Sequence, residues 1–233
     1  LQSYFMFWDK FEKSNYFLEN IIATLNEPRD GRLIMYLVSN PIQDGGQWHM
    51  FINLVNKYGV VPQSEMPETF QSSKSMRMNR MITRKLREFS KNLRDAYKKG
   101  ASLEELRFIK TDMLGIVYRL LTIHLGTPPE IFDWQVRDRK KNFHRFEGLT
   151  PKRFFLDHVG LDLKDYVCLI NCPMSDKTYN QVYTVEYLGN VVGGEDIRYL
   201  NLPSKRLKET AIASIKSDNP VWFGCDVGKH FHR

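Results

Sequence analysis

Two long stretches of helical periodicity, separated by only a few residues, constrain this fold more than any other feature of the sequence. Residues 72–99 and residues 103–125 each repeat apolar side chains at spacings of three and four. Gly100 interrupts the pattern, and Ser102 and Glu105 have the spacing of a capping box that starts a new helix. Because the link is so short, the two helices should pack as an antiparallel hairpin.

Further helices are predicted before this hairpin. Residues 3–25 carry apolar side chains on one face, and residues 48–58 form a short amphipathic helix that Gly59 is placed to end. Residues 31–39 are apolar and fit either a helix or a strand. Residues 40–46 are rich in turn-forming residues and predict a loop.

The pattern changes in the second half of the chain. Thr150 followed by Pro151 is typical of a helix start, and residues 204–217 form another amphipathic helix. Four runs rich in β-branched and aromatic residues predict strands. These runs are residues 166–171, 182–188, 197–200 and 221–225. Helices first and strands later predict an α+β fold.

The positive charge is concentrated in the middle of the chain. The 233 residues carry a net charge of +7, yet residues 74–110 alone sum to +8 and residues 137–153 to +5, which leaves −6 for the rest. A hydrophobic content of 42% excludes a wholly disordered chain. No apolar run approaches the roughly 20 residues of a membrane helix, so no membrane partner is expected. The basic middle permits an anionic partner.

The three cysteines give little evidence for a disulfide framework, a catalytic site or a metal site. Their small, odd number argues against a disulfide framework and indicates a reducing, cytoplasmic compartment. Cys225 and His230 have the spacing of a nucleophile–base pair, but the apolar run around Cys225 favours a buried structural thiol. Cys168 and Cys172 lack a second pair of ligands, which argues against a metal site. No phosphate-loop, dinucleotide or zinc-peptidase motif occurs, so no cofactor is expected.

The basic helix over residues 72–99 leaves two interpretations open. Its arginines can contact the phosphates of a nucleic acid, or they can form a solvated helix face. No base-stacking or groove-reading motif accompanies them. The arginines that would make phosphate contacts are Arg77, Arg80, Arg84 and Arg87.

Eight stretches of the sequence, in order along essentially the whole chain, form a specific pattern. They are residues 2–10 (QSYFMFWDK), 44–48 (DGGQW), 57–62 (KYGVVP), 137–142 (RDRKKN), 149–151 (LTP), 183–188 (YTVEYL), 192–194 (VGG) and 221–231 (VWFGCDVGKHF). Together they resemble the bleomycin hydrolase / aminopeptidase C group of papain-like cysteine peptidases.

This resemblance implies a papain-like catalytic core interrupted by a large helical insertion. Residues 1–65 would form the helical part of the core, residues 66–165 the basic insertion, and residues 166–233 the β-rich part. In the family the insertion builds a homohexameric ring whose channel can be positively charged, and some members bind nucleic acid. Family members are cytoplasmic thiol aminopeptidases, hydrolases that act on peptides.

The resemblance places no catalytic residue in this sequence. The family's oxyanion-hole glutamine and nucleophilic cysteine precede the stretch that begins at Gln2, and its catalytic histidine and asparagine follow the stretch that ends at Phe231. Leu1 is neither an initiator methionine nor part of a signal peptide, so a processed product or a fragment is expected. Without thiolate, base and oxyanion donor, the chain is expected to be inactive by itself.

The resemblance instead implies a substrate role for the di-glycine segment. Gly45 and Gly46 match the papain-like segment whose backbone pairs with the substrate main chain, where a side chain would block the approach. A tight turn is the alternative explanation for two adjacent glycines. Asp44, Gln47 and Trp48 flank the pair and are expected to shape the cleft.

Two classes of function therefore stay open. The first is the central segment of a bleomycin hydrolase-like cysteine aminopeptidase, whose chemistry belongs to the intact parent. The second is a non-catalytic assembly or nucleic-acid-binding protein derived from the same fold. Salt-dependent DNA binding that is lost when the arginines are neutralised would support the second class without excluding the first.

Overall fold

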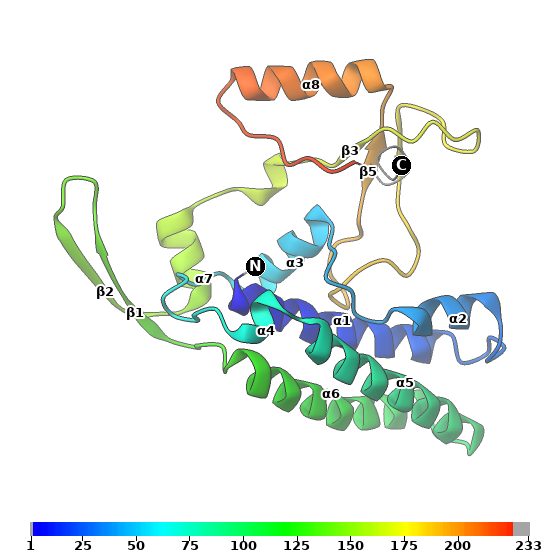
Figure 1. The fold of residues 1–233 in the computed structure, drawn as a ribbon. Helices are drawn as coiled ribbons and strands as arrows, with labels where there is room; N and C mark the ends of the chain where they lie inside the picture. Colours follow the sequence, from blue (N-terminus) through cyan, green and yellow to red (C-terminus); the bar gives the residue numbers. More distant parts are fainter. Residues whose placement is uncertain (1, 226–233) are drawn as a thin grey trace. The chain divides into compact units, whose positions relative to one another are not determined.

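A computed structural model describes residues 2–225 of the chain, which folds as two compact units (Figure 1). The first unit consists of Leu1–Leu163 with Val185–Ile197, and the second of Lys164–Thr184 with Arg198–Arg233. The mixture of helices and strands confirms the predicted α+β class. None of the helices in the described range is both long and apolar enough to cross a membrane.

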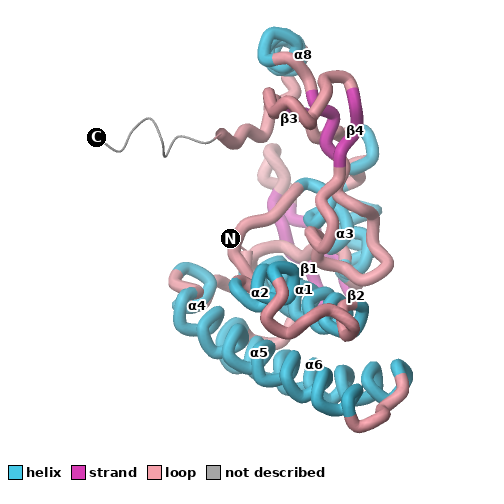
Figure 2. Tube along the Cα trace, turned by 90° about the vertical axis from the view of Figure 1, so that its right-hand side faces the viewer, coloured by secondary structure: helices cyan, strands magenta, loops and turns pink. Residues whose placement is uncertain are grey.

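Three long helices build the core of the first unit: α1 (Ser3–Ala23), α5 (Met76–Lys98) and α6 (Leu103–Leu125). The predicted hairpin of α5 and α6 is confirmed, and α1 packs against both of them (Figures 1 and 2). The capping box is also confirmed. The side chain of Ser102 accepts a hydrogen bond from the N–H of Glu105, and the carboxylate of Glu105 accepts one from the N–H of Ser102.

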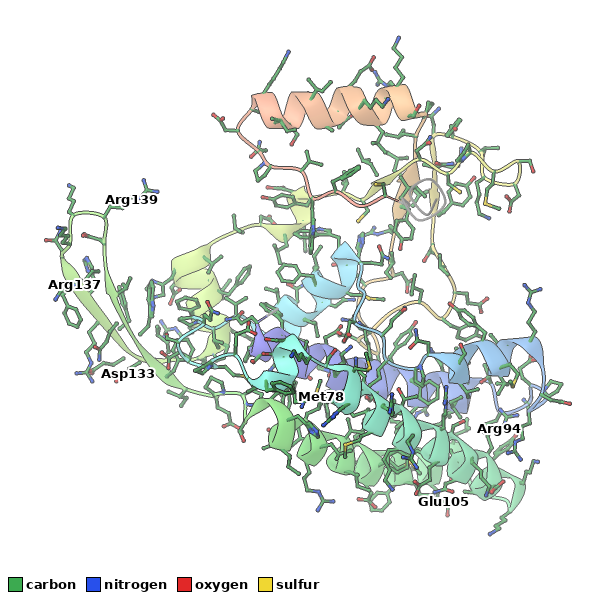
Figure 3. All side chains as sticks on the ribbon, viewed as in Figure 1. Met78, Arg94, Glu105, Asp133, Arg137 and Arg139 are labelled. Carbon is green, nitrogen blue, oxygen red and sulfur yellow. The ribbon has the colours of Figure 1, made fainter. Side chains whose placement is uncertain are left out.

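The apolar stripe of α5 faces this core, as the spacing predicts. Met81 and Tyr97 lie at the edges of the stripe and are exposed. Arg94 is only 8% exposed, and its guanidinium donates to the backbone oxygens of Thr24 and Glu27 (Figure 3). A buried cation therefore caps the C-terminal end of α1. The buried members of the stripe are Met78, Ile82, Leu86, Phe89 and Leu93.

Shorter helices surround these three. The ambiguous segment 31–39 is a helix, the predicted helix after residue 48 is confirmed, and the capped start at Thr150 is confirmed. A four-residue helix precedes α5, so the predicted continuous helix over 72–99 is broken at Lys74. The elements are α2 (Arg32–Ser39), α3 (Trp48–Tyr58), α4 (Phe70–Ser73), α7 (Pro151–Phe154), a π-helical turn (Phe155–Val159) and a 3₁₀ turn (Leu163–Asp165).

A β-hairpin that the sequence analysis did not predict follows α6. It pairs β1 (Phe132–Arg137) with β2 (Phe143–Leu149) in antiparallel register. Trp134 stacks on Phe146 with their ring centroids 5.4 Å apart, and His158 packs against Phe146 at 4.4 Å, so aromatic contacts attach its base to the π-helical turn. Its distal end carries Arg137 and Arg139 (Figure 3).

The second unit is a small three-stranded sheet followed by a helix. Its strand order is β3 (Leu169–Ile170), β5 (Tyr199–Asn201) and β4 (Gln181–Tyr183), with β3 parallel and β4 antiparallel to β5. Fully buried Asn201 donates from Nδ2 to the backbone oxygens of Cys172 and Lys177, each at 3.0 Å. The helix α8 (Ser204–Lys216) confirms the amphipathic pattern, but none of its residues is buried.

The predicted strands are longer than the observed ones. Only residues 169–170 of the first run pair. Of the second run, only residues 182–183 belong to a strand, β4, and they are followed by a turn in which Tyr187 has a φ of +59°. The predicted strand 221–225 is wrong, because those residues form no strand and most of their side chains are exposed. β-branched and aromatic residues favour extended backbone, but a strand also needs a pairing partner.

Replacing Gly59 with alanine should destabilise the fold strongly. Gly59 has φ +72° and ψ −158°, and a Cβ there would lie 2.3 Å from the carbonyl carbon of Pro151. We expect a loss of about 3 kcal/mol or more in the free energy of unfolding, measured by denaturant titration.

The matched control is Gly115→Ala in the interior of α6, where a Cβ would meet no atom within 4 Å. It should stabilise the protein by about 0.5–1 kcal/mol, since alanine has the higher helix propensity. Equal stabilities for the two variants would contradict this account of Gly59.

Candidate substrate-binding loop

The di-glycine segment lies in the loop between α2 and α3. Gly45 and Gly46 are exposed, and neither has a positive φ. A Cβ at Gly45 would meet nothing within 4 Å, and one at Gly46 would meet only Sδ of Met50 at 4.0 Å. Within the described residues, neither a positive φ nor internal packing therefore requires glycine at these two positions.

Two buried lysines of α1 hold the loop from inside. Nζ of Lys13 donates to the backbone oxygens of Gly45 at 2.7 Å and Gln43 at 2.9 Å. Nζ of Lys10 donates to the same oxygen of Gln43 at 2.8 Å. The residues are 5% and 1% exposed, so these bonds form away from water, where charge-assisted hydrogen bonds are strong.

Two aspartates balance the charge of the buried ammonium groups. Asp9 lies 2.7 Å from Nζ of Lys13, and Asp44 lies 2.7 Å from Nζ of Lys10. Burial raises the pKa of Asp9 despite the nearby lysines, and burial lowers the pKa of Lys10. The cluster of Asp9, Lys10, Lys13 and Asp44, called the loop-anchoring cluster below, thus pairs each buried cation with an anion.

Asp44 also connects the loop to α5. Its Oδ2 accepts a hydrogen bond from Oγ of Ser75 at 2.7 Å, and its Oδ1 accepts one from Nδ2 of Asn79 at 2.9 Å. Partial burial raises the pKa of this carboxyl, but the hydrogen bonds from Lys10, Asn79 and Ser75 outweigh that effect and lower the pKa to about 2.

Asp44 was predicted from the sequence as a site residue, whereas Lys10 and Lys13 were not. Both lysines lie among the buried residues of α1, and buried lysines are found almost only where they are paired. A pair of lysines three residues apart among core positions was the available signal. Their partner, the backbone of residues 43–45, is some 30 residues away in sequence, and no local pattern reveals it.

Gln47 and Trp48 form the start of α3. Gln47 is exposed, and its backbone oxygen accepts hydrogen bonds from the N–H groups of Met50 and Phe51. Trp48 is half-buried, and its ring centroid lies 5.4 Å from that of Phe51. Both residues therefore lie directly beside the di-glycine segment, with Trp48 fixed by aromatic packing.

A groove of about 950 Å³ runs beside the loop. Its lining includes Asp44 of the loop and Arg77 and Arg80 of α5. The fold therefore brings part of the predicted phosphate-binding set next to the predicted substrate loop. Arg84 does not line the groove, and Arg87 donates to the backbone oxygens of Val38 and Ser39, both at 2.8 Å, where it caps α2.

One of the three cysteines departs from the sequence-based expectation. Cys225 is exposed, so the prediction of a buried thiol is wrong: the apolar run around it does not enter a sheet. Its proposed partner His230 lies outside the described residues. Within residues 2–225, no group of three or more histidine, cysteine or acidic side chains is arranged to hold a metal ion.

Comparison with known proteins shows the relationship directly. The model of the peptidase C1-like family matches residues 1–233. The chain belongs to this family. Its relatives include Aminopeptidase C of Listeria innocua, 49% identical over 228 residues that make up 98% of this chain and 51% of the relative. Bleomycin hydrolase of Gallus gallus is 46% identical over 235 residues, 99% of this chain and 52% of the relative.

A solved structure agrees with this membership of the peptidase C1-like family. The crystal structure of PepW from Lactobacillus rhamnosis HN001 matches with a TM-score of 0.96 and 48% sequence identity, over 100% of this chain and 52% of that one. The resemblance to papain-like peptidases is thereby confirmed. The chain spans about half the length of the relatives it matches.

The depressed pKa of Asp44 predicts a loss of stability in acid. A carboxyl whose pKa is lower in the folded than in the unfolded state stabilises the fold above its unfolded pKa, ordinarily 3.8 for aspartate, and loses that contribution as pH falls towards 2. Because this side chain is half exposed, we expect about 1 kcal/mol after screening.

Thermal unfolding of the wild-type protein and of Asp44→Asn between pH 5 and pH 2 checks this expectation. The two curves should converge as pH falls, because protonation removes the same charge that the substitution removes. A constant difference between them across this range would contradict the role of Asp44.

Proposed function

We propose that this segment supplies the substrate-positioning part of a cysteine aminopeptidase that removes N-terminal residues from peptides by thiol acyl transfer. The observation that carries the proposal is the di-glycine loop, which is exposed although neither a positive φ nor packing among the described residues requires glycine there. The names of the relatives, Aminopeptidase C and Bleomycin hydrolase, support the class of reaction.

In this proposal the substrate main chain lies along residues 45–46. An extended peptide binds to exposed backbone by N–H and C=O hydrogen bonds, as in other cases of strand addition. Gly46 is suited to this use, since among the described residues no hydrogen bond engages its own N–H or C=O. Asp44, Gln47 and Trp48 would shape the adjoining cleft.

The reaction itself requires a thiolate, a base and an oxyanion donor held together. We place these groups in the intact parent, outside the matched positions of this chain. Residues 1–65 and 166–233 would belong to the papain-like core, and residues 66–165 would be the insertion that serves assembly into a homohexameric ring. The small, odd number of cysteines supports a reducing, cytoplasmic setting.

The substitution Gly46→Leu in the full-length enzyme tests the substrate role. The side chain would occupy the space that the substrate backbone needs, so we expect kcat/KM on peptide substrates to fall by at least about ten-fold. The melting temperature should stay unchanged, because only Sδ of Met50 lies near the new Cβ.

Gly194→Ala is a useful contrast, because its Cβ would lie 2.8 Å from the side chain of Asn53. That variant should lose stability, whereas its KM should stay at the wild-type value. Wild-type kinetics in the Gly46→Leu enzyme would contradict the assignment.

A second prediction concerns the 233 residues alone. Since the resemblance gives none of their cysteines or histidines a catalytic position, the isolated polypeptide should show no thiol-dependent aminopeptidase turnover. The measurement is hydrolysis of a fluorogenic aminoacyl amide with and without a thiol-alkylating reagent. Turnover that the reagent abolishes would overturn the proposal.

Nucleic-acid binding is the second candidate function. It is favoured by the exposed row of Arg77, Arg80 and Arg84 on α5, two of which line the groove. Replacing all three with glutamine should weaken DNA binding and reduce the salt dependence by about 0.9 in log–log slope per lost phosphate contact. Arg87→Gln is the matched control, because this arginine is engaged with α2. A slope that the triple substitution leaves unchanged would exclude this candidate.

A further inference from the structure

The hydrogen bond from Lys13 to Gly45 has a consequence for the next residue. The carbonyl of Gly45 and the N–H of Gly46 belong to one peptide unit, and no described peptide bond is cis. In a trans peptide the C=O and the N–H point in opposite directions. Because Lys13 is 5% exposed and holds the carbonyl from inside, the N–H of Gly46 is directed away from the interior.

Little else fixes the orientation of this peptide. Glycine has wide conformational freedom, so residues 45–46 could rotate without a steric penalty. Neither a positive φ nor packing around a Cβ constrains them. The hydrogen bonds that reach the loop from α1 come from the ammonium groups of Lys10 and Lys13. The loop-anchoring cluster thus supplies the rigidity that the glycines lack.

The charge of Lys13 has an electronic effect as well. A cationic donor on a carbonyl polarises the peptide unit and makes its N–H a stronger donor. Asp9, at 2.7 Å from Nζ, compensates the ammonium within the helix without contacting the loop. The N–H of Gly46 is therefore both oriented and strengthened by a group that a bound substrate does not touch.

We propose that Lys13 is a positioning residue that directs the N–H of Gly46 towards the main chain of the peptide substrate. Lys10 and Asp44 fix the preceding part of the loop, and Ser75 and Asn79 anchor Asp44 to α5. This inference rests on the proposed substrate role of the di-glycine loop. It identifies Lys13 as the residue that fixes the orientation of the Gly46 N–H for binding.

The test uses the full-length enzyme with Lys13→Met and with the double substitution Asp9→Asn/Lys13→Met. The single variant leaves Asp9 buried without its cation and can fail to fold. The double variant removes both charges together and keeps the site neutral. We expect KM for peptide substrates to rise on the order of ten-fold in the double variant, the effect of losing a charged hydrogen bond, with kcat and melting temperature nearly unchanged.

Two further variants separate positioning from general stability. Lys13→Arg retains a cationic donor, so its KM should lie closer to that of the wild type. Lys57→Met removes another lysine that pairs with a buried carboxylate, that of Glu12 at 2.8 Å, but it does not contact residues 43–46. Its stability should fall while its KM stays at the wild-type value.

The outcomes are distinguishable. A folded Asp9→Asn/Lys13→Met enzyme with wild-type KM would overturn the role of Lys13, even if Gly46→Leu still impairs the enzyme and the proposed function stands. An equal rise of KM in Lys57→Met would also overturn it, because lost stability would then explain the effect. A wild-type full-length enzyme without peptidase activity would instead refute the proposed function.

Discussion

Two buried ammonium groups on α1 hold the loop on which the functional interpretation depends. Lys10 and Lys13 each donate to backbone carbonyls of residues 43–45, and each is paired with an aspartate. A buried cation is costly unless it is paired and hydrogen-bonded, and here both conditions are met. The loop can therefore keep a defined geometry although glycine itself imposes few conformational restrictions.

The same cluster joins two regions that the resemblance assigns to different parts of the parent protein. Asp44 comes from the region expected to form the catalytic core, whereas Ser75 and Asn79 come from the region expected to form the insertion. The groove beside them is lined by both regions. The hydrogen bonds of Asp44 thus connect the start of α5 to the loop that carries the two glycines.

The helices could be predicted from the sequence because their signals are local. The spacing of Met78, Ile82 and Leu86 and the capping box of Ser102 and Glu105 each lie within one or two turns. The strands were predicted less well, since pairing is non-local: residues 221–225 are rich in strand-forming types but do not pair. The β1–β2 hairpin was missed although Phe132, Trp134 and Val136 alternate with polar residues.

The candidate site, too, was predicted only where its signal in the sequence is local. The glycines and Asp44 were found through the motif, but Lys10 and Lys13 act through backbone carbonyls that have no sequence signature. The most direct test is a crystal structure of the full-length enzyme with a covalently bound peptide aldehyde. The account predicts the inhibitor main chain within hydrogen-bond distance of the Gly46 N–H, with Lys13 still donating to Gly45. An inhibitor that avoids residues 45–46 would contradict it.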